Sequence, residues 1–249
     1  MFSRILQWFG RLLATYLTRQ VHIHRATLPP TASQLLSALQ TGDVLLVEGD
    51  SRISGAIKYL TQSSWSHAAL YVGEQTIAGV RHAATFIEAD IKDGVRCVSV
   101  DEFRGLNARI CRPIGLSPED CQRVAEYAIG RIGQQYDLRN VIDLARYLIP
   151  NPPVTQQQRR QMLVLGSGDP TRAICSTLVA QAFQSIRYPI LPRIDQAAHT
   201  EQCPDCIEEI LTIRHHSLFV PRDFDLSPYF EVIKPSLPQS FDYHSLQWR

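Results

Sequence analysis

The sequence lacks any run of about 20 apolar residues, the length that a transmembrane helix needs. It also lacks a recognisable export signal, because polar residues interrupt the apolar N-terminal stretch and no small-residue cleavage site follows. The interrupting residues are Arg4, Gln7, Arg11 and Arg19. We therefore expect neither a membrane-spanning segment nor a cleaved leader, and we predict a cytoplasmic protein.

The chain also lacks an excess of charge of either sign. Its 25 basic and 24 acidic residues leave a formal net charge of +1. Nothing in this balance indicates the basic surface that nucleic-acid phosphates require, so we expect no nucleic-acid partner. The segments GDVLLVEGD (42–50) and GEQTIAG (73–79) lack the spacing of phosphate-binding loops, and we expect no nucleotide cofactor.

Cysteine is scarce as well. Six cysteines in 249 residues do not form the dense framework of a disulfide-stabilised domain, and reduced thiols are the simpler interpretation. Cys203 and Cys206 form a C-x-x-C pair, and a zinc site could recruit His215, His216 or His199. A redox or disulfide pair is another alternative. The spacing matches no standard zinc finger, so we expect plain thiols, with no metal and no cofactor.

What the sequence does contain is a core and an amphipathic N-terminus. Hydrophobic residues make up 45% of the chain, enough for one elaborated domain. Segment 1–20 has helical apolar spacing, with arginines on its polar side. One interpretation is a helix lying in the plane of the inner membrane surface, with Trp8 near the headgroups. The other is a helix docked on the protein itself, because bare apolar surface is costly in water.

The rest of the chain divides into a connector, a domain and an extension. Residues 21–39 are the connector, 40–187 hold the strands and helices of an α+β domain, and 188–249 are a proline-rich extension that we expect to wrap the domain. A polar, breaker-rich stretch predicts an inserted loop at 150–172. Strands are predicted at 43–49, 67–73, 85–90, 94–103 and 107–114, and helices at 51–63, 117–132, 135–149 and from Cys175.

The segment ICSTLVAQAF (174–183) places Cys175 at the start of a predicted helix. A helix N-terminus offers unpaired N–H groups and positive potential, which favour a reactive thiolate. His67 opens a predicted strand and Glu88 lies on the next one. If these strands pair, Glu88 can orient His67 while His67 exchanges a proton with Cys175. Asp90 is an alternative to Glu88, and each residue could instead be ordinary: a small core cysteine, a hydrogen-bonded histidine and a solvated carboxylate.

Further residues are candidates for an oxyanion hole or for substrate binding. The backbone N–H of Cys175 is one, because it lies at a helix start. Tyr136 could offer its hydroxyl, or it could be a packed core aromatic. Ser66 and Ser176 adjoin His67 and Cys175 and could contribute hydrogen bonds.

These motifs resemble those of a known family. TGDVLLVEGDSRISGAIKYLTQSSWSHAALYVG (41–73) precedes FIEAD (86–90), YD (136–137) and CSTLVAQAF (175–183). The order and spacing are similar to those of the circularly permuted NlpC/P60 (papain-like) cysteine hydrolases, most of all to the YiiX/YebB-like branch. The lecithin:retinol acyltransferase-type enzymes are more distant relatives. The resemblance spans roughly residues 40–185.

The resemblance implies a permuted papain-like fold, with an antiparallel sheet packed against helices. It implies Cys175 as nucleophile, His67 as general base and acid, and Glu88 as the orienting residue. We therefore expect a thiol hydrolase or acyltransferase that cleaves an amide or ester acyl bond through a thioester. The substrate would be a small peptide or an acyl lipid, and the amphipathic segment favours a lipid. The alternative is a catalytically silent binding or scaffold protein on the same fold.

Overall fold

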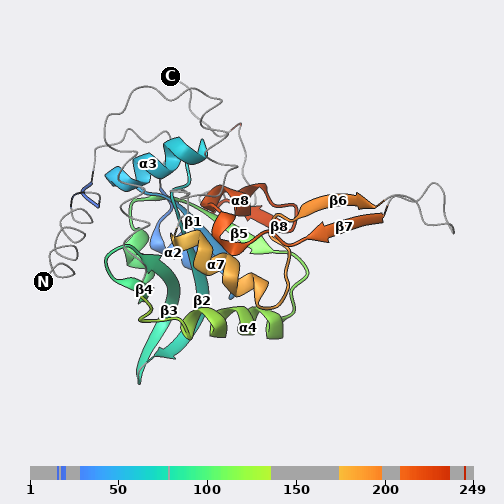
Figure 1. The fold of residues 1–249 in the computed structure, drawn as a ribbon. Helices are drawn as coiled ribbons and strands as arrows, with labels where there is room; N and C mark the ends of the chain where they lie inside the picture. Colours follow the sequence, from blue (N-terminus) through green and yellow to red (C-terminus); the bar gives the residue numbers. More distant parts are fainter. Residues whose placement is uncertain are drawn as a thin grey trace, which may run out of the picture.

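A six-stranded antiparallel sheet forms the centre of the molecule, in the order β4-β3-β2-β1-β5-β8 (Figure 1). It is seen in a computed structural model that describes residues 16, 18–20, 29–77, 79–135, 174–197, 208–235 and 244. The strands are β1 (Val44–Glu48), β2 (His67–Ile77), β3 (Val80–Asp90), β4 (Gly94–Val98), β5 (Asn107–Pro113), β8 (Phe230–Ile233) and, in a separate two-stranded ribbon, β6 (Arg193–Ala197) and β7 (Glu208–Thr212).

Helices cover both faces of this sheet. Helices α4 and α7 share a hydrophobic cluster with one face, and α2 with the 3₁₀ helix η1 shares another with the opposite face. The arrangement confirms the predicted α+β class. The helices are α2 (Ala32–Ala38), α3 (Arg52–Thr61), η1 (Val100–Phe103), α4 (Pro118–Ile129), α7 (Ile174–Gln184), η2 (His216–Leu218) and α8 (Pro221–Leu226).

Strand β1 lies inside the sheet and is buried on both sides. Val44 and Leu46 pack toward α4 and α7, whereas Leu45 and Val47 pack toward α2 and η1. A strand with two buried faces needs a continuous apolar run, not an alternating one, which explains the VLLV sequence. The strand predicted at 43–49 is therefore confirmed.

Helix α7 is almost fully buried. The predicted stripe of Leu178, Val179, Ala182 and Phe183 is at most 1% exposed, and so is Ala180. The helix packs against β2, β3 and α4. This burial fixes the position of its N-terminal turn, which carries Cys175.

Helix α4 begins as predicted but ends early. The Ser117 hydroxyl accepts the N–H of Asp120, and Pro118 takes the first helical position. The helix stops at Ile129, not at Ile132, because Gly130 is a poor helix former and the next N–H, that of Arg131, turns to the carbonyl of Ala128.

Two strands are longer than predicted. β2 continues past Gly73 to Ile77, and β3 begins at Val80, not at residue 85. The added pairs, such as Gln75 with His82, are partly exposed and lack the apolar alternation that marks a strand. In the opposite sense, the strand predicted at 94–103 ends at Val98 and continues into η1.

The C-terminal extension contributes to the sheet. β8 pairs with β5 and becomes an edge strand, and α8 packs against β1 and β8. The ribbon of β6 and β7 projects away from the domain (Figure 1). Weak periodicity in the sequence therefore conceals regular structure in this region.

Few residues of the N-terminal segment are described, and they contact the start of α3. Gln20 forms a β-bridge with Ser51, and the Arg52 guanidinium lies 4.1 Å from the centre of the Tyr16 ring. Among the described helices, none combines the length and the apolar character that crossing a membrane requires. Several predicted segments lie wholly or partly outside the described residues. They are most of the helix 1–20, residues 21–28 of the connector, the helix predicted at 135–149 except Gln135, and the loop at 150–172.

Candidate active site

His67 begins β2 at one end of the sheet and pairs with Val47 of β1. The turn before it is held by backbone contacts. The Ser66 N–H donates to the carbonyl of Val47 (3.1 Å), and the Ser66 hydroxyl accepts the N–H of Gly49 (2.9 Å). The His67 side chain is 25% exposed. Its imidazole is therefore positioned by the sheet and remains partly accessible.

The C-terminal extension supports the same turn. Trp65, which is buried, donates its Nε1–H to Asp225 of α8 over 3.1 Å. Asp225 also pairs with Arg109 of β5, whose Nη1 lies 2.5 and 2.7 Å from the two carboxylate oxygens. The Arg109 guanidinium lies 5.0 Å from the centre of the Trp65 ring. Nothing in the sequence pattern indicated this contact, because Trp65 and Asp225 are 160 residues apart.

Glu88 of β3 hydrogen-bonds to the His67 ring. Strands β2 and β3 pair with Leu70 opposite Ile87, which puts Glu88 on the strand next to His67. The distance between His67 Nε2 and Glu88 Oε2 is 2.7 Å, and the Glu88 side chain is only 3% exposed. Strands β2 and β3 therefore pair, as the expected contact between His67 and Glu88 requires.

Asp90 has a different environment. Its Oδ1 accepts the backbone N–H groups of Lys92 (2.7 Å) and Asp93 (3.0 Å), which closes the turn between β3 and β4. Of the two carboxylates considered for orienting His67, Glu88 is the one in contact with it.

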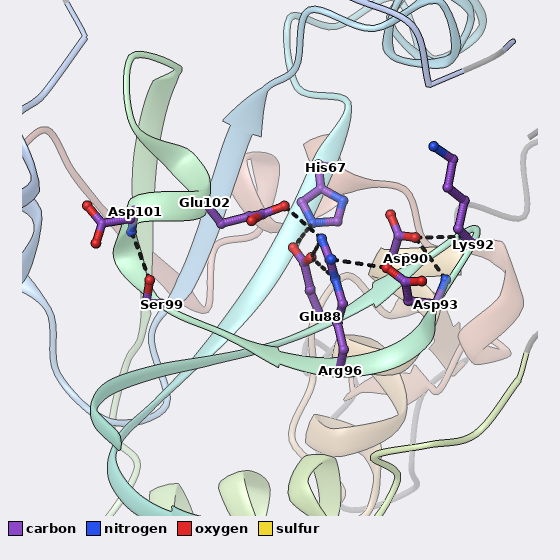
Figure 2. A network of polar contacts seen from close by, with 9 residues as sticks. All are labelled: His67, Glu88, Asp90, Lys92, Asp93, Arg96, Ser99, Asp101 and Glu102. Atoms are coloured by element: carbon purple, nitrogen blue, oxygen red, sulfur yellow. Dashed lines mark hydrogen bonds and ion pairs between the residues drawn. The ribbon is translucent and has the colours of Figure 1, made fainter. Parts of the chain in front are cut away.

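Arg96 of β4 lies directly opposite Glu88 and binds its other oxygen (Figure 2). Arg96 Nε is 2.9 Å and Nη2 is 2.7 Å from Glu88 Oε1. The guanidinium also contacts Asp93 (3.2 Å) and Glu102 (2.7 Å). No sequence motif indicated Arg96. The available signal was an opposite charge on the neighbouring strand, which becomes informative only once the register between the strands is known.

Cys175 is the second residue of α7 and is 5% exposed. Its thiol lies close enough to the His67 imidazole to raise the pKa of the ring. Since Nε2 of the ring is engaged by Glu88, Nδ1 is the nitrogen left for the thiol. The residue lies in the first helical turn, where backbone N–H groups have no intrahelical partner. The fold thus brings Cys175, His67 and Glu88 together from α7, β2 and β3.

The pKa of His67 is raised well above its ordinary value. Burial alone lowers it, because a low-dielectric site disfavours the charged ring. The negative charge and hydrogen bond of Cys175, followed by those of Glu88, outweigh that effect. The site therefore favours a protonated His67, the state in which the ring can deliver a proton.

The pKa of Glu88 is lowered, although burial alone would raise it. The hydrogen bond and charge of His67 are the main opposing causes, and Arg96 adds to them. Glu88 accordingly remains a carboxylate that accepts the ring N–H of His67.

The oxyanion-hole candidates have varied surroundings. The Ser66 hydroxyl is engaged with Gly49, as described above, and the Ser176 hydroxyl donates to the carbonyl of Phe219 over 2.7 Å. Both serines are buried. Tyr136 lies outside the described residues. The backbone N–H of Cys175 remains the donor closest in sequence to the thiol.

The remaining cysteines and histidines do not assemble a metal centre within the part of the chain that the structure describes, where no cluster of three or more potential ligands occurs. His215 and His216 stack with ring centres 4.0 Å apart, and His216 contacts Gln181. Cys203, Cys206 and His199 lie outside the described ranges. Cys97, Cys111, Cys121 and Cys175 are free thiols.

Comparisons with known proteins match the central part of the chain. Residues 38–147 match the model of a family described as permuted papain-like amidase enzymes (YaeF/YiiX, C92 family). His67 and Glu88 lie inside the matched segment, and Cys175 lies beyond it. Among solved structures, the metalloprotein YiiX (DUF1105) of Escherichia coli O157:H7 aligns with 18% identity over 78% of this chain and 96% of its own, with a TM-score of 0.44. A comparison with curated proteins gives no match.

Proposed function

We propose that the protein is a thiol-dependent hydrolase or acyltransferase, because residues 38–147 match the model of the permuted papain-like amidase family (YaeF/YiiX, C92), as the sequence motifs predicted. It would act on an amide or ester acyl bond with Cys175 as nucleophile. The observation that carries this proposal is the position of His67, whose ring lies beside Cys175 and hydrogen-bonds to Glu88.

The chemistry follows from these contacts. The Cys175 sulfur attacks the acyl carbonyl, and an S–C bond forms. His67 gives its proton to the leaving amine or alcohol as the C–N or C–O bond breaks, which leaves a thioester. His67 then removes a proton from water, or from an acceptor hydroxyl, which attacks the thioester and releases the acyl product and the thiolate. Glu88 holds the ring and stabilises its charged form.

The developing oxyanion needs donors aimed at its position. The Cys175 backbone N–H is our first candidate, and Tyr136 is a second. Ser66 and Ser176 remain candidates for binding substrate only if their hydroxyls exchange the backbone partners described above. For the substrate we propose a small peptide or an acyl lipid. For the location we propose the cytoplasm, with peripheral contact at the inner membrane surface through residues 1–20, and no nucleic-acid partner.

A second candidate function is a binding or scaffold protein with a silent site. The 5% exposure of Cys175 favours it, because a buried thiol is hard for a substrate to reach. The two functions differ in the reactivity of Cys175. An activated thiolate reacts near neutral pH, whereas an ordinary thiol with a pKa of about 8.5 is only about 1% ionised at about pH 6.5.

The test is a pH series of iodoacetamide alkylation, with mass spectrometry assigning the rate to each cysteine. We expect Cys175 to react selectively at about pH 6.5 and to lose that selectivity in His67→Ala. Burial raises the pKa of Cys97, Cys111 and Cys121, so these thiols are internal standards. His82→Ala, in the outer part of the β2–β3 hairpin, is the matched control and should behave like wild type.

Either outcome decides the next step. Selective, His67-dependent reaction would justify a screen of acyl-peptide amides and acyl-lipid esters, with Cys175→Ala as the inactive reference. If Cys175 reacts no faster than the internal standards, the hydrolase proposal fails and the binding function takes its place.

A further inference from the structure

The Glu88 carboxylate is shared between two partners with different roles. Its Oε2 is 2.7 Å from His67 Nε2, and its Oε1 is 2.7 Å from Arg96 Nη2 (Figure 2). A carboxylate can rotate about its last bond, which has a broad torsional profile. The contact with Arg96 restricts that rotation. The orientation of Oε2 toward His67 therefore depends on Arg96, whose own contacts among the described residues are with carboxylates and not with the His67 ring.

Arg96 is itself held from several directions. Its strand pairs with β3 so that Arg96 is opposite Glu88. Glu102 of η1 accepts from Nη2 at 2.7 Å, and Asp93 of the β3–β4 turn lies 3.2 Å from Nη1. A side chain with three carboxylate partners on three elements has little freedom to leave its position.

The start of β4 is anchored as well. Gly94 has a φ of +73°, and a Cβ there would lie 2.3 Å from the carbonyl oxygen of Gln134, so only glycine fits this approach. The Val95 N–H donates to that carbonyl over 3.0 Å. The backbone two residues before Arg96 is thus fixed against the segment that follows α4.

We propose that Arg96 is a positioning residue of the active site, which holds Glu88 in the orientation that aims its second oxygen at His67. This inference rests on the proposed function. Arginine suits the role because its planar fork directs Nε and Nη2 to one oxygen while Nη1 and Nη2 reach the flanking carboxylates. Lysine would supply the charge without that geometry.

Two other roles for Arg96 predict different behaviour. If Arg96 acted only as a cation near His67, its removal would favour the protonated ring. If it only joined β4 to β3, its removal would lower stability without changing the titration of His67. If it positions Glu88, its removal weakens the contact of Glu88 with His67 and disfavours the protonated ring. The ionisable groups around the pair are His67 and Cys175 on one side, and Asp90, Asp93 and Glu102 around Arg96 on the other.

The experiment compares two alkylating reagents at Cys175 across pH. Anionic iodoacetate gains over neutral iodoacetamide while His67 carries a positive charge, so the ratio of the two rates falls as His67 loses its proton. The pH at the midpoint of this fall in the rate ratio reports the titration of His67. Because it is a ratio of two rates, it does not depend on the amount of folded protein. The variants are Arg96→Met, Arg96→Lys, Glu102→Gln and Glu88→Gln. The control is Arg104→Met, because Arg104 is an exposed neighbour that pairs only with Asp101 among the described residues.

In Arg96→Met we expect the midpoint to move to lower pH. We also expect Cys175 alkylation at neutral pH to fall roughly tenfold, the lower end of the losses seen when partners that orient metal-binding histidines are removed. Arg96→Lys should lie between wild type and Arg96→Met. Glu102→Gln should shift the midpoint in the same direction by less, and its exposed position makes misfolding of little concern. Arg104→Met should match wild type.

The double variant Arg96→Met/Glu88→Gln completes the test. If Arg96 acts through Glu88, it should show no further shift beyond Glu88→Gln alone. Three outcomes would overturn the positioning role. The first is a further shift of the midpoint in the double variant beyond Glu88→Gln. The others are an unchanged or raised midpoint in Arg96→Met and a wild-type midpoint in Arg96→Lys. If the ratio of iodoacetate to iodoacetamide rates at Cys175 does not change with pH in the wild-type protein, the proposed function fails, and the positioning role fails with it.

Discussion

Two buried carboxylates are each paired with an arginine on a neighbouring strand. Asp43, just before β1, is 1% exposed and binds Arg112 of β5 through both oxygens, at 2.9 and 2.7 Å. Its Oδ2 also accepts the N–H of Gln40 (2.8 Å). Glu88 of β3 is 3% exposed and gives one oxygen to Arg96 and the other to His67.

The difference between the pairs lies in what the arginine leaves free. Arg112 binds both oxygens of Asp43, and the backbone N–H of Gln40 shares one of them. That pair joins the chain before β1 to β5 and leaves neither oxygen free for a titratable group. Arg96 occupies one oxygen of Glu88 and leaves the second for a ring that can gain or lose a proton. A similar ion pair therefore serves structure in one place and orients a titratable group in the other.

Breaking the Asp43–Arg112 pair should have the largest effect on stability. Arg112→Met leaves the buried Asp43 charge uncompensated, and we expect the free energy of unfolding to fall by about 3–5 kcal/mol. Urea unfolding followed by circular dichroism measures this loss. Arg123→Met, which removes an exposed pair with Asp120, should cost at most about 1 kcal/mol. A loss in Arg112→Met no larger than in this control would contradict a structural role for the Asp43 pair.

Breaking the contacts of Glu88 should have an intermediate effect on the free energy of unfolding, and this effect should depend on pH. Glu88→Gln removes a charge-assisted contact on each side, and we expect a loss of about 1.5–3 kcal/mol at neutral pH. The pKa of Glu88 is lowered in the folded state, so its stabilisation is present above the ordinary value of 4.5 and disappears as pH falls through the folded-state value. The unfolding free energies of wild type and Glu88→Gln should therefore converge in acid.

The same urea titrations, repeated from neutral pH to well below 4.5, give the measurement. Glu74→Gln is the matched control, because Glu74 forms an exposed pair with Arg81 on the same hairpin and is screened by solvent. A constant difference between wild type and Glu88→Gln at every pH would show that ionisation of Glu88 contributes nothing to stability.

The smallest effect should come from perturbing the turn before His67 without touching Glu88. Trp65→Phe removes the hydrogen bond to Asp225 while keeping most of the buried ring, and we expect a loss of about 1 kcal/mol. The titration midpoint of His67, read from the iodoacetate-to-iodoacetamide ratio, should stay at its wild-type value. A midpoint that moves as far as in Glu88→Gln would mean that the turn, and not the carboxylate, controls the ring.

Local patterns in the sequence were sufficient for several elements. The buried strand β1, the N-terminal cap of α4 and the apolar stripe of α7 depend on neighbouring residues, and each was predicted. His67 and Glu88 lie on strands predicted to be consecutive, and contact between them was expected if those strands pair, as consecutive strands often do. Cys175 was a candidate because it lies at a predicted helix start, and the family resemblance implied its role as nucleophile. The fold places it beside His67.

Only the tertiary structure could decide the contacts that depend on register or on distant segments. Glu88 contacts His67, whereas Asp90 accepts the backbone N–H groups of Lys92 and Asp93 in the β3–β4 turn. The contact with Arg96 follows from the register of β4. Asp225 reaches Trp65, and β8 joins β5, because the C-terminal extension returns to the sheet. A sequence pattern reports which face of an element is apolar, whereas partners far apart in the chain are selected by packing of the whole domain.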